Sequence, residues 1–98
     1  IGAMNPVGTI IIDNGAEIAL KGGSSLLPAG IKKIEGEFSR GDVISIKSIT
    51  NEKIGLGLAG YSSNDALKII GHKSSEIASI LNYSYREEMI HKDDLALL

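Results

Sequence analysis

Between residues 31 and 58, apolar and polar side chains alternate in three successive segments, and this alternation limits the folds open to the chain. A period of two is typical of a strand that buries one face. The positions on the alternating faces are Ile34, Gly36, Phe38, Ile44, Ile46, Ile54, Leu56 and Leu58. Polar turns at residues 39–42 and 50–53 separate the segments. The pattern therefore predicts three antiparallel strands joined by two adjacent hairpins, a meander.

Glycines alternate with the apolar residues of the third segment, at Gly55 and Gly57. Glycines on one face of a strand allow other backbone to pack closely against it. Together with Gly60 they also match G-x-G-x-x-G, the fingerprint of a dinucleotide-binding loop. That fingerprint needs a preceding apolar strand and a second parallel strand that ends in an acidic residue. Because a polar turn precedes it here and a helical pattern follows, we interpret the segment as a closely packed strand.

Two short elements and a loop are expected before the alternating segments. The β-branched run Thr9–Ile12, followed by the turn dipeptide Asn14–Gly15, predicts a short buried strand. The helix formers Ala16–Lys21 predict a helix of about two turns that ends at Gly22–Gly23. In the loop Ser24–Gly30, we expect both leucines to point inward.

Two further helices and a last strand are expected after the alternating segments. Ser62 and Asp65 have the spacing of a capping box, which predicts a short helix that ends at Gly71. After Ser74, apolar residues at i, i+3 and i+4 predict another short helix. The final apolar run Leu95–Leu98 could then close the sheet.

Composition indicates one small domain without disulfide bonds. The chain has 98 residues and no cysteine, which excludes disulfides and thiol chemistry and fits a reducing, cytoplasmic compartment. No apolar run approaches the roughly 20 residues that span a bilayer, so we expect no membrane partner. With 12 acidic and 10 basic residues, and aromatics at 4%, the chain lacks the basic surface and stacking side chains of a general nucleic-acid binder.

The best basic group consists of Lys21, Lys32, Lys33 and Arg40, and it is a candidate phosphate-contacting patch. Acidic residues alternate with two of these lysines, so an ordinary solvated surface explains the same residues.

A candidate anion cradle runs from Lys21 through Gly22, Gly23 and Ser24 to Ser25. Glycines allow backbone N–H groups to converge on an anion, and a lysine adds positive charge. The segment lacks the G-x-x-x-x-G-K-S/T spacing of a P-loop, and the end of a helix followed by a turn explains every residue in it. Both interpretations remain open at this point.

His72, His91, Asp93 and Asp94 are the one group that could bind a metal or transfer protons. Their spacing matches no familiar set of metal ligands, and they supply no arrangement of nucleophile, base and orienting group. Surface histidines and a solvated turn explain them as well. We therefore expect no catalytic, cofactor-binding or metal-binding residue in this chain.

Five blocks follow one another along the chain: GSSLLPAGI from Gly23, GEFSRGDVI from Gly36, YSSNDAL from Tyr61, GHKSSEI from Gly71 and IHKDDL from Ile90. In this order they resemble the PUA domain at the C-terminal end of bacterial glutamate 5-kinases. The resemblance extends over nearly the whole chain, from Thr9 to Leu97. It implies a mainly β (α+β) fold, a PUA-like pseudo-barrel of mostly antiparallel strands with short flanking helices. Residues 1–8 would be a linker from an N-terminal kinase domain, or an unrelated remnant, and residues 9–98 the PUA domain.

The resemblance also implies a role without catalysis. The family phosphorylates the γ-carboxylate of glutamate with ATP and Mg²⁺, the first step of proline synthesis, and proline commonly inhibits it. Its catalytic and cofactor-binding residues belong to the kinase domain, so this chain would be a regulatory or architectural module that contacts that domain or other subunits. PUA domains elsewhere hold RNA, mostly through the first helix and the following loop. Here these would be Lys21–Pro28 with Lys32 and Lys33, which makes an RNA-binding module the alternative.

Overall fold

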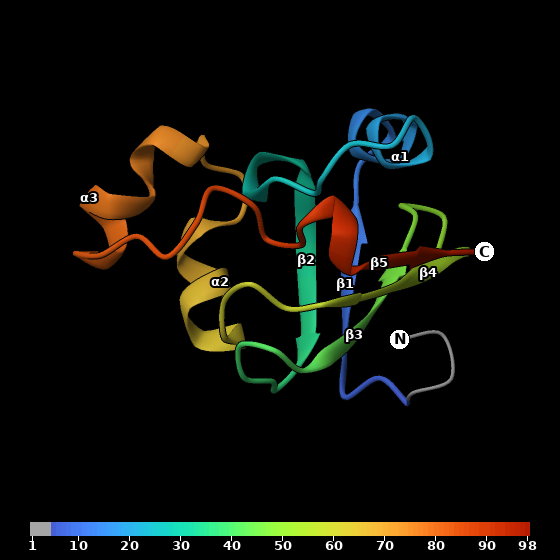
Figure 1. The fold of residues 1–98 in the computed structure, drawn as a ribbon, viewed down its shortest axis with the longest axis horizontal. Helices are drawn as coiled ribbons and strands as arrows, with labels where there is room; N and C mark the ends of the chain where they lie inside the picture. Colours follow the sequence, from blue (N-terminus) through green and yellow to red (C-terminus); the bar gives the residue numbers. More distant parts are fainter. Residues whose placement is uncertain (1–4) are drawn as a thin grey trace.

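The computed structural model describes residues 5–98, which form a five-stranded mixed sheet with short helices around it (Figure 1). The order across the sheet is β2-β1-β3-β4-β5. The strands are β1 (Gly8–Ile12), β2 (Ile31–Gly36), β3 (Val43–Lys47), β4 (Lys53–Leu58) and β5 (Leu95–Leu97). The helices are α1 (Asn14–Lys21), α2 (Ser63–Ile69) and α3 (Ile77–Leu81), with single 3₁₀ turns at Pro28–Gly30, Ser74–Glu76 and Lys92–Asp94.

The predicted linker, residues 1–8, falls partly outside this description. Residues 1–4 lie outside the described residues, and Gly8 is already the first residue of β1. Val7 donates a backbone hydrogen bond of 2.9 Å to the carbonyl of Val43, next to the sheet. The sheet therefore begins one residue before the predicted boundary of the domain.

Strand β1 lies between β2 and β3, and this placement shows that half of the predicted meander is wrong. β1 pairs antiparallel with β2, where Gly8 lies opposite Gly36, and parallel with β3, where Gly8 lies opposite Ile44. The second predicted hairpin, between β3 and β4, is confirmed. Alternation shows that a segment is a strand, but it does not show which strand lies beside it.

The loop between β2 and β3 carries the chain over the end of β1. Gly36 has a φ of +84°, and a Cβ atom there would lie 3.2 Å from the Cα of Gly8. A Cβ atom on Gly8 would in turn lie 2.7 Å from the ring of Phe38, which covers this end of the strand. The predicted turn forms, since Ser39 N–H donates to the Asp42 carboxylate at 2.8 Å. It lies within a crossover over β1 instead of a hairpin.

A β-bulge in β2 interrupts the predicted alternation. The register shifts between Ile11 and Ile12 of β1, so Lys32 is an extra residue in the opposite strand. Such a residue changes which side chains point to each face. The bulge allows both Ile31 and Ile34, three residues apart, to pack on the core.

Asp13 is the N-cap of α1, and its side chain accepts a hydrogen bond from Ala16 N–H at 2.8 Å. A capping carboxylate satisfies a backbone donor that the first helical turn leaves free. Asn14 and Gly15 therefore form the first turn of the helix, and the predicted turn at this dipeptide is wrong.

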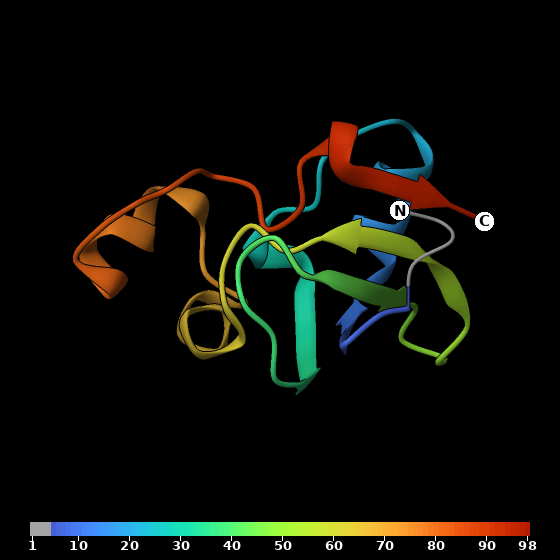
Figure 2. The same cartoon turned by 60° about the horizontal axis from the view of Figure 1, so that its bottom comes forward.

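Helix α2 lies beside the outer edge of β2, and hydrogen bonds from its first residue and from the chain just after its end join it to the residues that flank this strand. Ser63 N–H donates to the carbonyl of Phe38, and Gly71 N–H donates to that of Pro28, both at 2.9 Å. Ser62 accepts from Asp65 N–H, which confirms the predicted cap. Figure 2 shows α2 and α3 together beyond β2, on the opposite side from β4 and β5. The helix thus shields an edge that could otherwise pair with another chain.

The glycine face of β4 is closely packed, as the sequence predicts. A Cβ atom on Gly55 would lie 2.5 Å from the carbonyl oxygen of Ala96, and one on Gly57 would lie 2.7 Å from the side chain of Ile90. β5 pairs with β4 along this stretch, so the predicted last strand is confirmed.

The core lies between the sheet, α1, α2 and the segment that leads into β5. Its buried members are Ile10, Ile12, Leu20, Leu26, Ile31, Phe38, Ile44, Ile46, Ile54, Ala59, Tyr61, Ala66, Ile69, Ile77, Met89 and Ile90. Of the two leucines expected to point inward, Leu26 is 1% exposed, but Leu27 is 45% exposed. The prediction for Leu27 is wrong, because the chain runs there in extended conformation into the turn that starts at Pro28.

Replacing Gly55 by alanine should destabilise the fold. The new methyl group would meet the backbone of β5, which must then shift, so we expect a loss of about 1–3 kcal/mol in the free energy of unfolding. Urea denaturation measures it. Gly15→Ala is the matched control, because its Cβ would meet only Asp13 Oδ1 at 3.5 Å, an ordinary contact within a helix. Equal midpoints for the two variants would contradict the close packing of β5.

Candidate functional site

The backbone N–H groups of the predicted anion cradle are hydrogen-bonded at the C-terminal end of α1. The N–H groups of Gly22, Gly23 and Ser24 donate to the carbonyl oxygens of residues 18–20, each at 3.0 Å. Gly23 has a φ of +97°, and the bonds from Gly23 and Ser24 make up a Schellman motif. These three donors point into the helix end and are not free to bind an anion. The geometry thus favours the end of a helix over a cradle.

The side chains of the same segment are also engaged. Lys21 forms an ion pair of 2.8 Å with Glu17, and this hydrogen bond raises the pKa of Lys21. The hydroxyl of Ser25 accepts a hydrogen bond of 2.8 Å from the backbone N–H of Lys92. Ser25 therefore joins the loop after α1 to the segment before β5.

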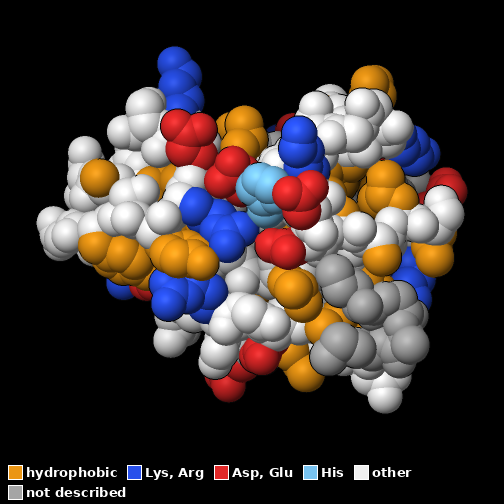
Figure 3. Space-filling view, viewed as in Figure 1, with side chains coloured by type: hydrophobic (Ala, Val, Ile, Leu, Met, Phe, Trp, Pro, Cys, Tyr) orange, Lys and Arg blue, Asp and Glu red, His pale blue; other side chains and the backbone are white. Residues whose placement is uncertain are grey.

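The structure does not gather Lys21, Lys32, Lys33 and Arg40 into one patch. Lys33 forms an ion pair with Glu35 at 3.4 Å, next to the bulge that holds Lys32. Arg40 follows the far end of β2, whereas α1 lies at the end where β2 begins. Figure 3 shows Lys and Arg side chains scattered over one face among Asp and Glu side chains. The phosphate backbone of a nucleic acid would therefore meet both positive and negative side chains on this face.

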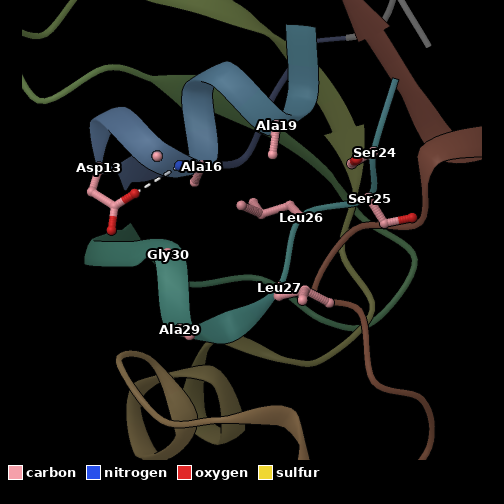
Figure 4. A pocket seen from close by; sticks show the side chains of 10 residues that line it. Asp13, Ala16, Ala19, Ser24, Ser25, Leu26, Leu27, Ala29 and Gly30 are labelled. Atoms are coloured by element: carbon pink, nitrogen blue, oxygen red, sulfur yellow. Dashed lines mark hydrogen bonds between the residues drawn. The ribbon is translucent and has the colours of Figure 1, made fainter. Parts of the chain in front are cut away.

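A hollow of about 400 Å³ lies between α1 and the turn at Pro28–Gly30 (Figure 4). Its lining residues are Asp13, Gly15, Ala16, Ala19, Ser24, Ser25, Leu26, Leu27, Ala29 and Gly30. Small apolar side chains form most of the wall, with the Asp13 carboxylate at one end and two serines at the other. Among the described residues, the lining includes neither lysine nor arginine. The hollow suits a small apolar group better than a phosphate.

The candidate metal or acid–base group does not come together. His72 lies 3.7 Å from Glu76, and His91 lies 3.5 Å from Asp93, each within its own short turn. Nδ1 of His91 also accepts from Asp93 N–H at 3.1 Å, so this histidine caps a 3₁₀ turn. Within residues 5–98, no group of three or more histidine or acidic side chains could hold a metal ion.

A cluster that the sequence analysis missed brings together all three tyrosines and both arginines of the chain. We call it the Tyr–Arg cluster, and it consists of Tyr61, Tyr83, Tyr85, Arg40 and Arg86, with Asp65 and Asp94 at its border. The five residues come from three segments that lie far apart in the sequence, at Arg40, at Tyr61 and at residues 83–86. Only the three-dimensional fold brings them together.

The buried Tyr61 holds the segment that carries the other aromatic residues. Its hydroxyl accepts hydrogen bonds from the N–H groups of Tyr85 and Arg86, both at 3.0 Å, and donates to the carbonyl of Arg86. The rings of Tyr83 and Tyr85 each lie 6.3 Å from the Tyr61 ring, a spacing typical of aromatic pairs. One buried side chain thereby orders an otherwise irregular stretch.

The exposed part of the cluster is held by charge. The guanidinium groups of Arg40 and Arg86 lie 4.0 and 4.7 Å from the centre of the Tyr85 ring, within the range of a cation–π interaction. Arg86 also donates to the Tyr85 hydroxyl at 3.1 Å, which lowers the pKa of Tyr85. Tyr83 donates to the Asp65 carboxylate, which raises the pKa of Tyr83. Tyr83 and Tyr85 are nonetheless 45% and 47% exposed.

The family model of the PUA domain matches residues 8–81 of this chain. The chain belongs to the PUA domain family. A solved structure of a PUA domain from Aeropyrum pernix K1 is similar, with a TM-score of 0.65 and 26% identity over 87% of this chain and 41% of that one. The mixed sheet, with three antiparallel strand pairs and one parallel pair, confirms the predicted α+β PUA-like fold.

Two further comparisons concern larger proteins, of which this chain matches only a part. The chain is 51% identical over 96 residues to a glutamate 5-kinase of Sinorhizobium fredii, a match that covers 98% of this chain. The chain spans only 24% of the length of that relative. It also resembles a chain of an H/ACA RNP bound to a substrate RNA, with a TM-score of 0.60 and 29% identity over 63% of this chain and 20% of that one.

Replacing Tyr61 by phenylalanine should destabilise this PUA domain, because it leaves the N–H groups of Tyr85 and Arg86 without their acceptor. We expect a loss of about 1–3 kcal/mol in the free energy of unfolding, measured by urea denaturation. The control is Tyr83→Phe, which removes an exposed hydrogen bond and should change stability by no more than about 0.5 kcal/mol. If both variants unfold like the parent chain, Tyr61 does not hold the segment.

Proposed function

We propose that this PUA domain is the non-catalytic, C-terminal module of a glutamate 5-kinase, in which it regulates or supports the kinase domain. The observation that carries the proposal is the match to the glutamate 5-kinase of Sinorhizobium fredii, which covers 98% of this chain but 24% of the relative. ATP, Mg²⁺ and glutamate would then bind in the kinase domain, outside this chain. Its partners would be that domain in the same polypeptide and neighbouring subunits.

The remaining assignments depend on the same proposal. Residues 1–8 would contain the end of the linker from the kinase domain, and residues 9–98 would be the module. Such a kinase works in the cytoplasm. Within residues 5–98, no helix has the length and apolar character needed to cross a membrane.

Deleting this module from a full-length glutamate 5-kinase should change how the enzyme responds to its effectors. We expect a shift in proline inhibition, in Mg²⁺ dependence or in oligomeric size, while the kinase domain keeps its phosphoryl-transfer activity. Steady-state kinetics at varied proline and Mg²⁺, together with analytical ultracentrifugation, measure these quantities. An enzyme without the module that matches the full-length enzyme in all three would refute the proposal.

RNA binding is the second candidate function, because the chain is similar to part of an H/ACA RNP bound to RNA. The residues that would contact the phosphates are Lys21, Gly22, Gly23, Ser24, Ser25, Lys32, Lys33 and Arg40. Two of these lysines are paired with carboxylates, and the backbone donors of the glycines are used inside α1. The neighbouring hollow has a carboxylate at one end. These contacts favour the kinase module over RNA binding.

A salt titration of the chain against structured RNA separates the two functions. We expect no measurable affinity even at low salt, because the basic side chains are dispersed or neutralised. True phosphate contacts would instead lower the logarithm of the affinity by roughly 0.7–0.9 per tenfold rise in salt for each phosphate neutralised. Such a slope, reduced in a Lys32→Ala, Lys33→Ala variant, would establish RNA binding.

A further inference from the structure

We propose that the hollow between α1 and the turn at Pro28–Gly30 binds a small organic ammonium ion, an amine carried on a short apolar chain (Figure 4). The ammonium group would lie at the Asp13 carboxylate, and the carbon chain would lie along the alanine and leucine side chains of the wall. The site is independent of the role proposed for the domain in a kinase, because every residue that forms it lies within residues 13–30.

The hollow has the size of a small-molecule site. Its volume of about 400 Å³ is near the lower end of the range for ligand pockets, roughly 300–1,000 Å³. The residues of α1 in its lining are Gly15, Ala16 and Ala19, and their small side chains leave the space open. A Cβ atom on Gly30 would lie 2.6 Å from the Cβ of Ala16, so the helix and the turn are already in contact beside Asp13. The walls of the hollow are therefore held in place without a ligand.

The Asp13 carboxylate has hydrogen-bonding capacity to spare. Among the lining residues that the structure describes, Asp13 is the one charged side chain. Its Oδ1 atom accepts from Ala16 N–H, but a carboxylate offers about four lone-pair sites on its two oxygens. Glu17, one turn later, is paired with Lys21, whereas no lysine, arginine or histidine within residues 5–98 forms an ion pair with Asp13. A ligand ammonium would supply both the counter-charge and the donors.

The rest of the lining suits the carbon chain of such a ligand. Figure 4 shows the side chains of Ala19, Leu26 and Leu27 between Asp13 at one end and Ser24 and Ser25 at the other. Carbon atoms that lie against this wall are removed from water, which favours binding.

The far end of the hollow can accept a polar group that carries no charge. The Ser25 hydroxyl accepts from Lys92 N–H, and its own proton remains available for donation. It can therefore donate to a hydroxyl or carbonyl oxygen at the other end of the ligand.

The same residues argue against anions and metal ions as ligands. The described lining includes neither lysine nor arginine, and the N–H groups of Gly22, Gly23 and Ser24 are bonded within the end of α1, so an anion would find no positive partner. Mg²⁺ and Ca²⁺ need several oxygen ligands around one point, whereas this hollow has its carboxylate at one end and its hydroxyls at the other. One carboxylate beside an apolar wall is the combination that an organic ammonium ion requires.

Titration of this chain with n-butylammonium chloride tests the site. The core is built from the chain's own residues, so the chain can be studied as it stands. We expect saturable shifts of amide NMR resonances in residues 13–30, with a dissociation constant on the order of millimolar, because the probe is small and the N-terminus of α1 offsets part of the Asp13 charge. The controls are n-butanol and sodium butyrate, which pair a similar carbon chain with no charge or with negative charge. At equal ionic strength, n-butanol should bind about fivefold more weakly, and butyrate should cause no saturable shift. Equal binding of all three probes, or tighter binding of butyrate, would overturn the proposal.

A pair of charge variants separates the site from general attraction to an acidic chain. Asp13→Asn keeps a residue that caps helices well but removes the charge. It should weaken n-butylammonium binding about fivefold and leave n-butanol binding unchanged. Glu17→Gln is the matched control, because it removes one negative charge from the same helix, outside the lining, and should leave both probes unaffected. Equal weakening in the two variants would assign the binding to net charge and contradict a site at Asp13.

Two further measurements locate the site and identify the source of the amine. Ala19→Leu fills the hollow from a helix that tolerates leucine well, and it should abolish the saturable shifts of both n-butylammonium and n-butanol. If this variant has the urea midpoint of the parent chain and still binds both probes, the hollow is not the site. Nα-acetyl-lysine methylamide presents the same ammonium chain from a peptide. If it binds about tenfold more tightly than n-butylammonium, the occupant is a lysine of another protein and the assignment to a free amine is wrong.

Discussion

The pairing of β1 with a strand on each side is the constraint on which the rest of the structure depends. Ile10 and Ile12 are fully buried, and their strand is antiparallel to β2 but parallel to β3. Parallel neighbours cannot be joined by a tight turn, so the chain needs a long connection between them. That connection is residues 13–42, and it contains α1, the walls of the hollow, β2 and Arg40. The position of β1 thus decides where most candidate functional residues lie.

A second constraint joins the hollow to the Tyr–Arg cluster through the segment before β5. Leu26 pairs with Ile90 in an isolated antiparallel bridge, and Gly60 N–H donates to the carbonyl of Met89 at 2.7 Å. Close approach is possible because β4 has glycines on its inner face. The loop after α1 and the strand β4 are therefore held by one stretch of backbone, which begins directly after the cluster. The hollow and the Tyr–Arg cluster therefore belong to one packed structure and are not separate loops.

Local rules account for what the sequence could predict, and long-range pairing accounts for what it could not. The cap at Ser62, the close packing at Gly55 and the last strand follow from side chains within a few residues of one another. The neighbour of β2 depends on β1, about twenty residues earlier, and alternation within β2 carries no information about it. The Tyr–Arg cluster was missed for the same reason, since Arg40 and Tyr85 are far apart in the chain and meet only in the folded structure.

The chain has a net charge of −2, and the structure shows that several of its basic side chains lie against a carboxylate or an aromatic ring. Lys21 and Lys33 lie against glutamates, Arg86 lies against Asp94, and Arg40 lies on an aromatic ring. A surface whose charges are neutralised by near neighbours has little long-range field to attract a polyanion. Recognition must then come from contact over a short range, where shape, stacking and directed hydrogen bonds decide affinity. The Tyr–Arg cluster offers stacking and directed hydrogen bonds at such short range, whereas the α1 segment offers chiefly the shape of its hollow.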